Sequence, residues 1–124
     1  MQEVLVYSES EIMRKYHSEI FYGQVDNASV FYLEGEKVPE GCNLFIINAS
    51  IEDSTTAPAT IAFGKIIGNR FEAFEEEDSP AAGITYHIDR TYRFKAGEKP
   101  CWRFETLALN DIIRGFAEGY YEEL

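Results

Sequence analysis

Residues 84–95, ITYHIDRTYRFK, carry the clearest strand pattern in the chain and decide the predicted fold. Apolar or aromatic side chains such as Tyr86 and Ile88 stand at every second position, with polar side chains between them. This two-residue period is typical of a β-strand with one buried face. Residues 96–100 then turn the chain back, and residues 101–107 alternate in the same way. We therefore expect a β-hairpin formed by these two segments.

Most of the chain before this hairpin is also predicted to form strands. Gly68-Asn69 separates two largely apolar runs, and this dipeptide favours a two-residue hairpin turn. The mostly apolar run 44–51 is typical of a central strand. Strands joined by short turns favour an antiparallel meander over parallel β-α-β units. The predicted strands are residues 3–7, 20–25, 29–33, 44–51, 60–67, 70–74, 84–95 and 101–107.

A helix is predicted near each end of the chain. Ser8 and Glu11 have the spacing of a capping box, which predicts a short helix that ends near His17. The C-terminal segment follows the apolar spacing of an amphipathic helix. The sequence therefore predicts one α+β domain over residues 1–124, with a curved antiparallel sheet or open barrel of about six to eight strands. The residues that define the C-terminal helix are Leu109, Ile112, Ile113, Phe116 and Tyr120.

Charge and composition exclude several classes of protein. The chain has 124 residues, of which 22 are acidic and 11 basic, giving a net charge of -11. Such an excess of acid argues against direct binding to nucleic acid. The first apolar run, residues 4–7, is too short for a signal peptide or a membrane span, so we expect a cytoplasmic protein with no membrane partner. Cys42 and Cys101 are expected to be free thiols.

Common catalytic motifs are absent from the sequence. It contains no phosphate-binding loop, dinucleotide fingerprint, zinc-protease motif, serine-hydrolase elbow or EF-hand loop. The two histidines and two cysteines lack partners at the short spacing of metal ligands. We therefore expect no cofactor and no metal, and a non-catalytic protein is favoured over an enzyme.

Basic residues on the predicted hairpin form a candidate ligand site. Residues 84–105 contain five basic and three acidic side chains, in a chain that is otherwise strongly acidic. Arginine recognises phosphate and carboxylate groups through paired hydrogen bonds, and histidine titrates near neutral pH. The alternative is that these residues pair across strands on a solvated face. The candidate ligand-binding residues are His87, Asp89, Arg90, Arg93 and Arg103.

The acidic run that follows the Gly68-Asn69 hairpin is predicted to be a loop. It is a candidate docking surface for a basic protein, with a neighbouring phenylalanine as an apolar anchor. The alternative is a solvated loop without a partner. The candidate partner-binding residues are Phe74, Glu75, Glu76, Glu77 and Asp78.

Two glycines lie one turn apart along the predicted C-terminal helix. Each costs on the order of 1 kcal/mol relative to alanine, so their presence needs a reason. They would let another backbone approach closely, either from the protein's own sheet or from a second subunit. The candidate interface residues are Gly115, Phe116, Gly119 and Tyr120.

Two functions of different classes stay open. The first is a non-catalytic interaction protein that forms a homo-oligomer, of the general character of acidic inhibitors and immunity-type proteins. The second is a barrel-like domain that binds or turns over a small anionic ligand through the arginine, histidine and aspartate cluster. Self-association, a basic protein and a small anion are the partners that these hypotheses imply.

Overall fold

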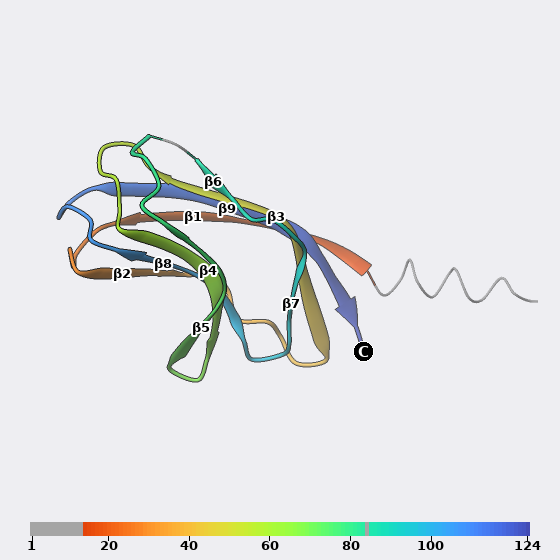
Figure 1. Cartoon of the computed structure of the whole chain (residues 1–124). Coiled ribbons are helices and arrows are strands. Elements are labelled where there is room, and N and C mark those ends of the chain that lie inside the picture. The colour runs from red at the N-terminus through yellow and green to blue at the C-terminus, as the bar shows by residue number, and fades with distance from the viewer. Residues whose placement is uncertain (1–13, 84) are drawn as a thin grey trace, which may run out of the picture.

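The computed structural model is an all-β sandwich of two open antiparallel sheets, and it describes residues 14–83 and 85–124 (Figure 1). The predicted α+β class is therefore wrong. No helix able to cross a bilayer occurs in the described residues. The strands are β1 (Arg14–Gln24), β2 (Val30–Glu34), β3 (Cys42–Asp53), β4 (Thr60–Ile67), β5 (Arg70–Asp78), β6 (Tyr86–His87), β7 (Tyr92–Phe94), β8 (Lys99–Glu105) and β9 (Ile112–Glu123).

The strand order is that of a jelly roll. Sheet A has the order β1-β9-β3-β6, with β7 also paired to β3, and sheet B has the order β2-β8-β4-β5. The chain passes repeatedly between the two sheets, and β6 and β7 together occupy one strand position. Two four-position antiparallel sheets connected in this way form the double-sheet jelly roll.

The core lies between the inner faces of the two sheets. Alternate residues of each strand point inward, as the two-residue period requires. Trp102 and Phe63 are fully buried, with ring centroids 4.7 Å apart, and Phe94 packs edge-on against Phe63. The core therefore has a group of packed aromatic rings, surrounded by buried aliphatic side chains.

Two of the predicted strand features are confirmed. Gly68-Asn69 is the two-residue connection between β4 and β5, and Gly68 has a φ of 65°, which favours glycine. Residues 44–51 lie within β3, which is an internal strand between β9 and the β6–β7 position.

The predicted C-terminal helix is wrong, because this segment forms β9. In β9, Ile113 and Ala117 are fully buried in the core, whereas Ile112 and Phe116 lie on the opposite face. A strand with apolar side chains on both faces reproduces the apolar spacing of a helix. A Cβ atom at Gly119 would overlap the carbonyl oxygen of Phe45, so the close backbone belongs to the protein's own sheet.

The predicted N-terminal helix is also wrong where the structure describes it. Residues 14–17 belong to β1 and pair with β9. The rest of that helix, including its capping box, and the predicted strand 3–7 lie outside the described residues.

The predicted hairpin between residues 84–95 and 101–107 is wrong as well. The first segment is divided into β6 and β7, which both pair with β3. The second segment is mostly β8, which pairs with β2 and β4 in the other sheet. The alternation of side chains reports strand structure and one-sided burial, but it carries no information about the pairing partner.

Candidate interaction surface

β1 is the longest edge strand of the sandwich. It has 11 residues and pairs with β9 along its whole length, while its other side has no strand beside it in the described structure. Such an edge presents unpaired backbone N–H and C=O groups to solvent and is a template for pairing with another chain. β1 is therefore the first candidate for an interaction site.

Three of the side chains that β1 turns outward are large, apolar and exposed. Ile20 is 80% exposed, Tyr16 69% and Tyr22 62%. They lie beside outward side chains of β9, since Ile20 is directly opposite Phe116 and Tyr16 is opposite Tyr120. We use the name outer apolar face for the following set: Tyr16, Ile20, Tyr22, Phe45, Ile47, Phe116 and Tyr120.

Contacts among these side chains hold the face in place. The rings of Phe45 and Tyr120 are stacked, with centroids 5.1 Å apart. The guanidinium of Arg14 lies 4.7 Å from the ring centroid of Tyr120, and Arg114 lies 6.0 Å from that of Tyr22. The aromatic rings are thus ordered by their neighbours, which lowers the entropy that a partner would have to remove on binding.

The extra residue in β3 enlarges this face. The register between β3 and β9 shifts between Ile46 and Asn48, which leaves Ile47 without a pairing partner. Such a β-bulge places an additional side chain on one strand. Ile47 is 51% exposed and adds to the outer apolar face.

The other three sheet edges each carry a feature that hinders strand pairing. β2 has only five residues, and the opposite edge of sheet A is divided between the two short strands β6 and β7. β5 is nine residues long, but it carries a row of acidic side chains. Short strands and charged side chains are the usual protection of an edge. β1 is longer than these edges, and the side chains that it turns outward between Tyr16 and Gln24 carry no charge.

The predicted partner-binding residues lie in β5, and the predicted acidic loop is therefore a strand. Phe74 points into the aromatic cluster, where its ring stacks on Tyr92 with centroids 4.4 Å apart. Glu76 forms an ion pair with Arg103, whereas Glu77 and Asp78 are exposed.

Glu75 is the centre of a hydrogen-bonded group that joins β5 to the β6–β7 region. Its carboxylate accepts hydrogen bonds from the hydroxyls of Tyr86 and Tyr92 and, at 3.1 Å, from the backbone N–H of Asp89. Burial first, and the hydrogen bond to Glu75 second, raise the pKa of both tyrosines above the usual range. Glu75 is thus engaged within the domain.

The five predicted ligand-binding residues do not form one cluster. His87 in β6 and Arg93 in β7 are exposed on sheet A, opposite Ser50 and Phe45 of β3. Asp89 and Arg90 lie in the exposed connection between β6 and β7.

Arg103 lies on sheet B, away from the other four residues. Its guanidinium lies 5.1 Å from the ring centroid of Phe71 and forms an ion pair with Glu76 of β5, which is two strands away in the same sheet.

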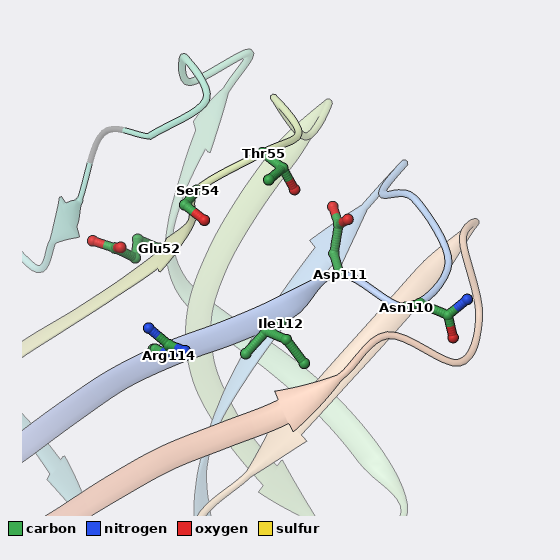
Figure 2. Close-up of a pocket in the computed structure, with 7 residues that line it drawn as sticks. All are labelled: Glu52, Ser54, Thr55, Asn110, Asp111, Ile112 and Arg114. Atoms are coloured by element: carbon green, nitrogen blue, oxygen red, sulfur yellow. The ribbon is translucent and has the colours of Figure 1, made fainter.

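A polar pocket lies at the end of the sandwich where the β3–β4 and β8–β9 loops meet (Figure 2). Thr55 and Asp111 approach each other there from the two loops, and the Thr56 hydroxyl donates to Asp111 Oδ2 at 2.5 Å. The residues that line the pocket are Glu52, Ser54, Thr55, Asn110, Asp111, Ile112 and Arg114.

Two carboxyl groups meet beneath this pocket. Asp53 is buried, and its Oδ1 atom accepts hydrogen bonds from the Thr55 and Thr56 backbones at 2.9 and 3.1 Å. Burial, as the largest cause, and the neighbouring carboxyl group of Asp111 raise the pKa of Asp53, while Asp53 and the Thr56 hydroxyl lower the pKa of Asp111. The Oδ2 atom of Asp53 is buried and has no hydrogen-bond partner within the described structure.

Comparison with known proteins reveals the fold but no family. No family model matches the chain, and no curated protein matches it. One similar structure comes from Bacillus endospore appendages described as disulfide-linked pili, with 12% identity, a TM-score of 0.53, and coverage of 90% of this chain and 89% of that chain. Another comes from the acid-stable capsid of Helicobacter pylori bacteriophage KHP30, with 14% identity, a TM-score of 0.53, and coverage of 88% and 93%. These likenesses concern the fold.

Sequence reasoning identified part of the outer apolar face and missed its β1 residues. Phe116 and Tyr120 were candidate interface residues, and both lie on this face. The uninterrupted apolar run Ile20-Phe21-Tyr22 could have indicated this face. Neighbouring strand residues point to opposite faces of the sheet, so such a run places an apolar side chain on the outer face whichever residue enters the core.

Proposed function

We propose that this chain is a non-catalytic domain that self-associates through β1 and the outer apolar face. The observation that carries the proposal is the difference between β1 and the other three edges. β1 is long, turns three large apolar side chains outward and has an open side in the described structure, whereas the others are short, divided or acidic. Natural sheets rarely leave an edge of this kind uncovered unless it is used.

The energetics of burial support the same proposal. Completely burying a large apolar side chain contributes about 1.5–3 kcal/mol, and Tyr16, Ile20 and Tyr22 are all mostly exposed in a single copy. A cluster of exposed apolar side chains beside polar surroundings marks interaction sites. Pairing through β1 would place these side chains against those of the second copy, which covers part of their exposed surface, and would pair the open backbone groups at the same time.

The acidic surface is consistent with a closed assembly of limited size. The net charge of -11 makes copies repel one another at long range, so association needs a specific contact that outweighs the repulsion. The acidic side chains of β5 oppose pairing at that edge. The inhibitor or immunity-type function and the anionic-ligand site stay predictions.

Measurement of molar mass over a range of concentrations tests self-association. Light scattering after size-exclusion chromatography is expected to give a multiple of the 14.2 kDa chain mass for the wild type. Ile20→Lys places a charge at the centre of the edge and is expected to give the monomer mass. Tyr32→Lys is the matched control, since Tyr32 is also exposed but lies on sheet B, and it should keep the wild-type mass.

Two outcomes would contradict the proposal. A wild type that stays monomeric at the highest attainable concentration shows that β1 does not mediate self-association. An Ile20→Lys variant that assembles like the wild type, with the same circular-dichroism spectrum, shows that the assembly uses another surface.

A further inference from the structure

The hydrogen-bonding pattern shows which backbone groups of β1 are free. The backbone N–H of Val25 donates to the carbonyl oxygen of Asp111 at 2.9 Å, in the same register as the β1–β9 ladder. In an antiparallel ladder, alternate residues direct both their N–H and C=O groups to the same neighbour. The odd-numbered residues of β1 therefore bond to β9. The groups that point to the open side belong to Tyr16, Ser18, Ile20, Tyr22 and Gln24.

We propose that β1 pairs antiparallel with β1 of a second copy, with Ile20 opposite the partner's Ile20. Sheet A would then continue through a two-fold axis into the partner. This inference rests on the proposed self-association and adds the occupant, direction and register of the contact. Ser18 would face the partner's Tyr22, and Tyr16 would face the partner's Gln24.

The charges at the two ends of β1 select the antiparallel direction. Arg14 and Lys15 begin the strand, and Asp26 lies two residues beyond its last residue, Gln24, with all three charged side chains exposed. Antiparallel pairing centred on Ile20 places Arg14 opposite the partner's Asp26. Parallel pairing would place the two basic residues beside their equivalents, and like charges directly opposite each other are destabilising.

The side chain of Glu19 selects the register. In the neighbouring antiparallel register, Glu19 lies on the two-fold axis. The even-numbered residues of β1 would still form the hydrogen bonds to the partner. This register would place Glu19 directly opposite the partner's Glu19 in a close pair, with Cα atoms about 4.5 Å apart. Two glutamates directly opposite each other are unfavourable, and the Glu19 carboxylate is already held within its own copy by His17 and by the backbone N–H of Glu36, whereas two isoleucines pack favourably. The register centred on Ile20 avoids the repulsion.

The same register makes the outer apolar face continuous across the axis. Ile20 already lies beside Phe116 of its own copy, and the partner's Ile20 would lie on its other side. Side chains directly opposite in an antiparallel pair have Cβ atoms about 4.5–5.5 Å apart. Because a two-fold contact uses the same strand of each copy, it occupies both edges and ends at a dimer.

Disulfide trapping tests the register. Cys42→Ser is used as the background, because the remaining cysteine, Cys101, is fully buried. In this background, Ile20→Cys is expected to form a covalent dimer on mild oxidation, since Cα atoms of a hydrogen-bonded pair lie about 5.5 Å apart. Gln24→Cys alone is expected to stay uncrosslinked, because the two copies of that residue would lie about 27 Å apart.

A mixture of two variants provides a positive control. Tyr16→Cys mixed with Gln24→Cys is expected to form a crosslinked heterodimer, although Gln24→Cys alone does not. Tyr32→Cys on sheet B measures crosslinking by random collision. A non-covalent dimer in which Ile20→Cys does not crosslink, or in which Gln24→Cys crosslinks alone, overturns this pairing but leaves self-association intact. A monomeric wild type overturns both.

Discussion

The rings of Phe74 and Tyr92 lie parallel, with centroids 4.4 Å apart and planes 2° apart, and they connect the two sheets on the side remote from β1. Phe74 belongs to the edge strand of sheet B, and Tyr92 to β7 of sheet A. This contact closes one side of the sandwich. The proposed contact with a second copy lies on the other side, at β1.

Removing either ring is expected to destabilise the domain. Phe74→Ala should lower the free energy of unfolding by about 3 kcal/mol, because it leaves a cavity against Phe63 and Phe94. Tyr92→Ala should have a similar effect. A double-mutant cycle measured by urea denaturation should give a coupling energy of about 1 kcal/mol for the stacked pair. A coupling near zero would show that the two rings contribute independently.

Glu75 is expected to stabilise the fold through its three hydrogen bonds. Glu75→Ala leaves the hydroxyls of Tyr86 and Tyr92 without this acceptor and should cost about 2 kcal/mol. Glu77→Ala, two residues along the same strand and exposed, should change stability by less than about 0.5 kcal/mol. Equal effects of the two substitutions in urea denaturation would contradict the role of Glu75.

The same group predicts how the protein responds to alkaline pH. The pKa values of Tyr86 and Tyr92 are raised in the folded state, so the unfolded chain loses these protons first. Their contribution to stability is therefore complete below the ordinary tyrosine pKa of 10.0 and is lost as the pH rises above it. Ultraviolet titration should show these two tyrosines ionising together with unfolding. Ionisation of all the tyrosines while the fold persists would be the contrary result.

The shifted pKa values of Asp53 and Asp111 predict a second pH dependence. The pKa of Asp53 is raised, so its contribution to stability is lost as the pH rises through the folded-state pKa of Asp53. The pKa of Asp111 is lowered, so its contribution is lost as the pH falls through the folded-state pKa of Asp111. The two groups together therefore contribute most to stability between these two pKa values.

Asp53→Asn tests this pair. An asparagine keeps an oxygen that accepts from the Thr55 backbone but carries no charge to bury, so the free energy of unfolding at pH 7 should increase by about 1 kcal/mol in urea denaturation. The gain should become smaller at low pH, where Asp53 of the wild type is itself protonated. Asp78→Asn at an exposed position of β5 is the control. A variant that is destabilised equally at all pH values would contradict the raised pKa of Asp53.

The two thiols are expected to differ in reactivity. Cys101 is fully buried, and burial raises the pKa of its thiol to about 12, while Cys42 is only half-buried. Because the thiolate is the reactive form, iodoacetamide should label Cys42 first in the folded protein. Peptide mass spectrometry measures the two rates, and in urea they should become equal. Faster labelling of Cys101 in the folded state would show that its strand opens.

The sequence predicted strands where turn residues or continuous apolar runs marked them, and failed where apolar residues on both faces of a strand had the spacing of a helix. The β4–β5 hairpin and β3 were predicted because turn residues and apolar runs mark them locally. In β9, the core requires Ile113 and Ala117, and the outer face adds Ile112 and Phe116 on the other side. Their combined spacing is that of a helix. The error therefore came from the same residues that form the outer apolar face.

The candidate sites depended on which strands pair, and local patterns do not contain that information. His87 and Arg103 shared one face only if residues 84–95 paired with 101–107, whereas these segments belong to different sheets. Glu75 looked like one member of a solvated run, yet it is held by two tyrosines that follow it by 11 and 17 residues. Such contacts are formed by the sandwich as a whole.

β3 and β5 are each a regular strand with a single inserted residue. In β3 this residue is Ile47, and in β5 it is Phe74, which has no pairing partner in β4 because the register shifts there. Without Ile47 the side chains of β3 would still alternate correctly between the core and the outside, and the same holds for β5 without Phe74. One insertion supplies an exposed side chain to the outer apolar face, and the other supplies a ring to the core. Deletion of Ile47 or Phe74 should therefore leave the remaining side chains of each strand on their present faces. A deletion elsewhere in either strand would move the side chains that follow it to the opposite face of the sheet.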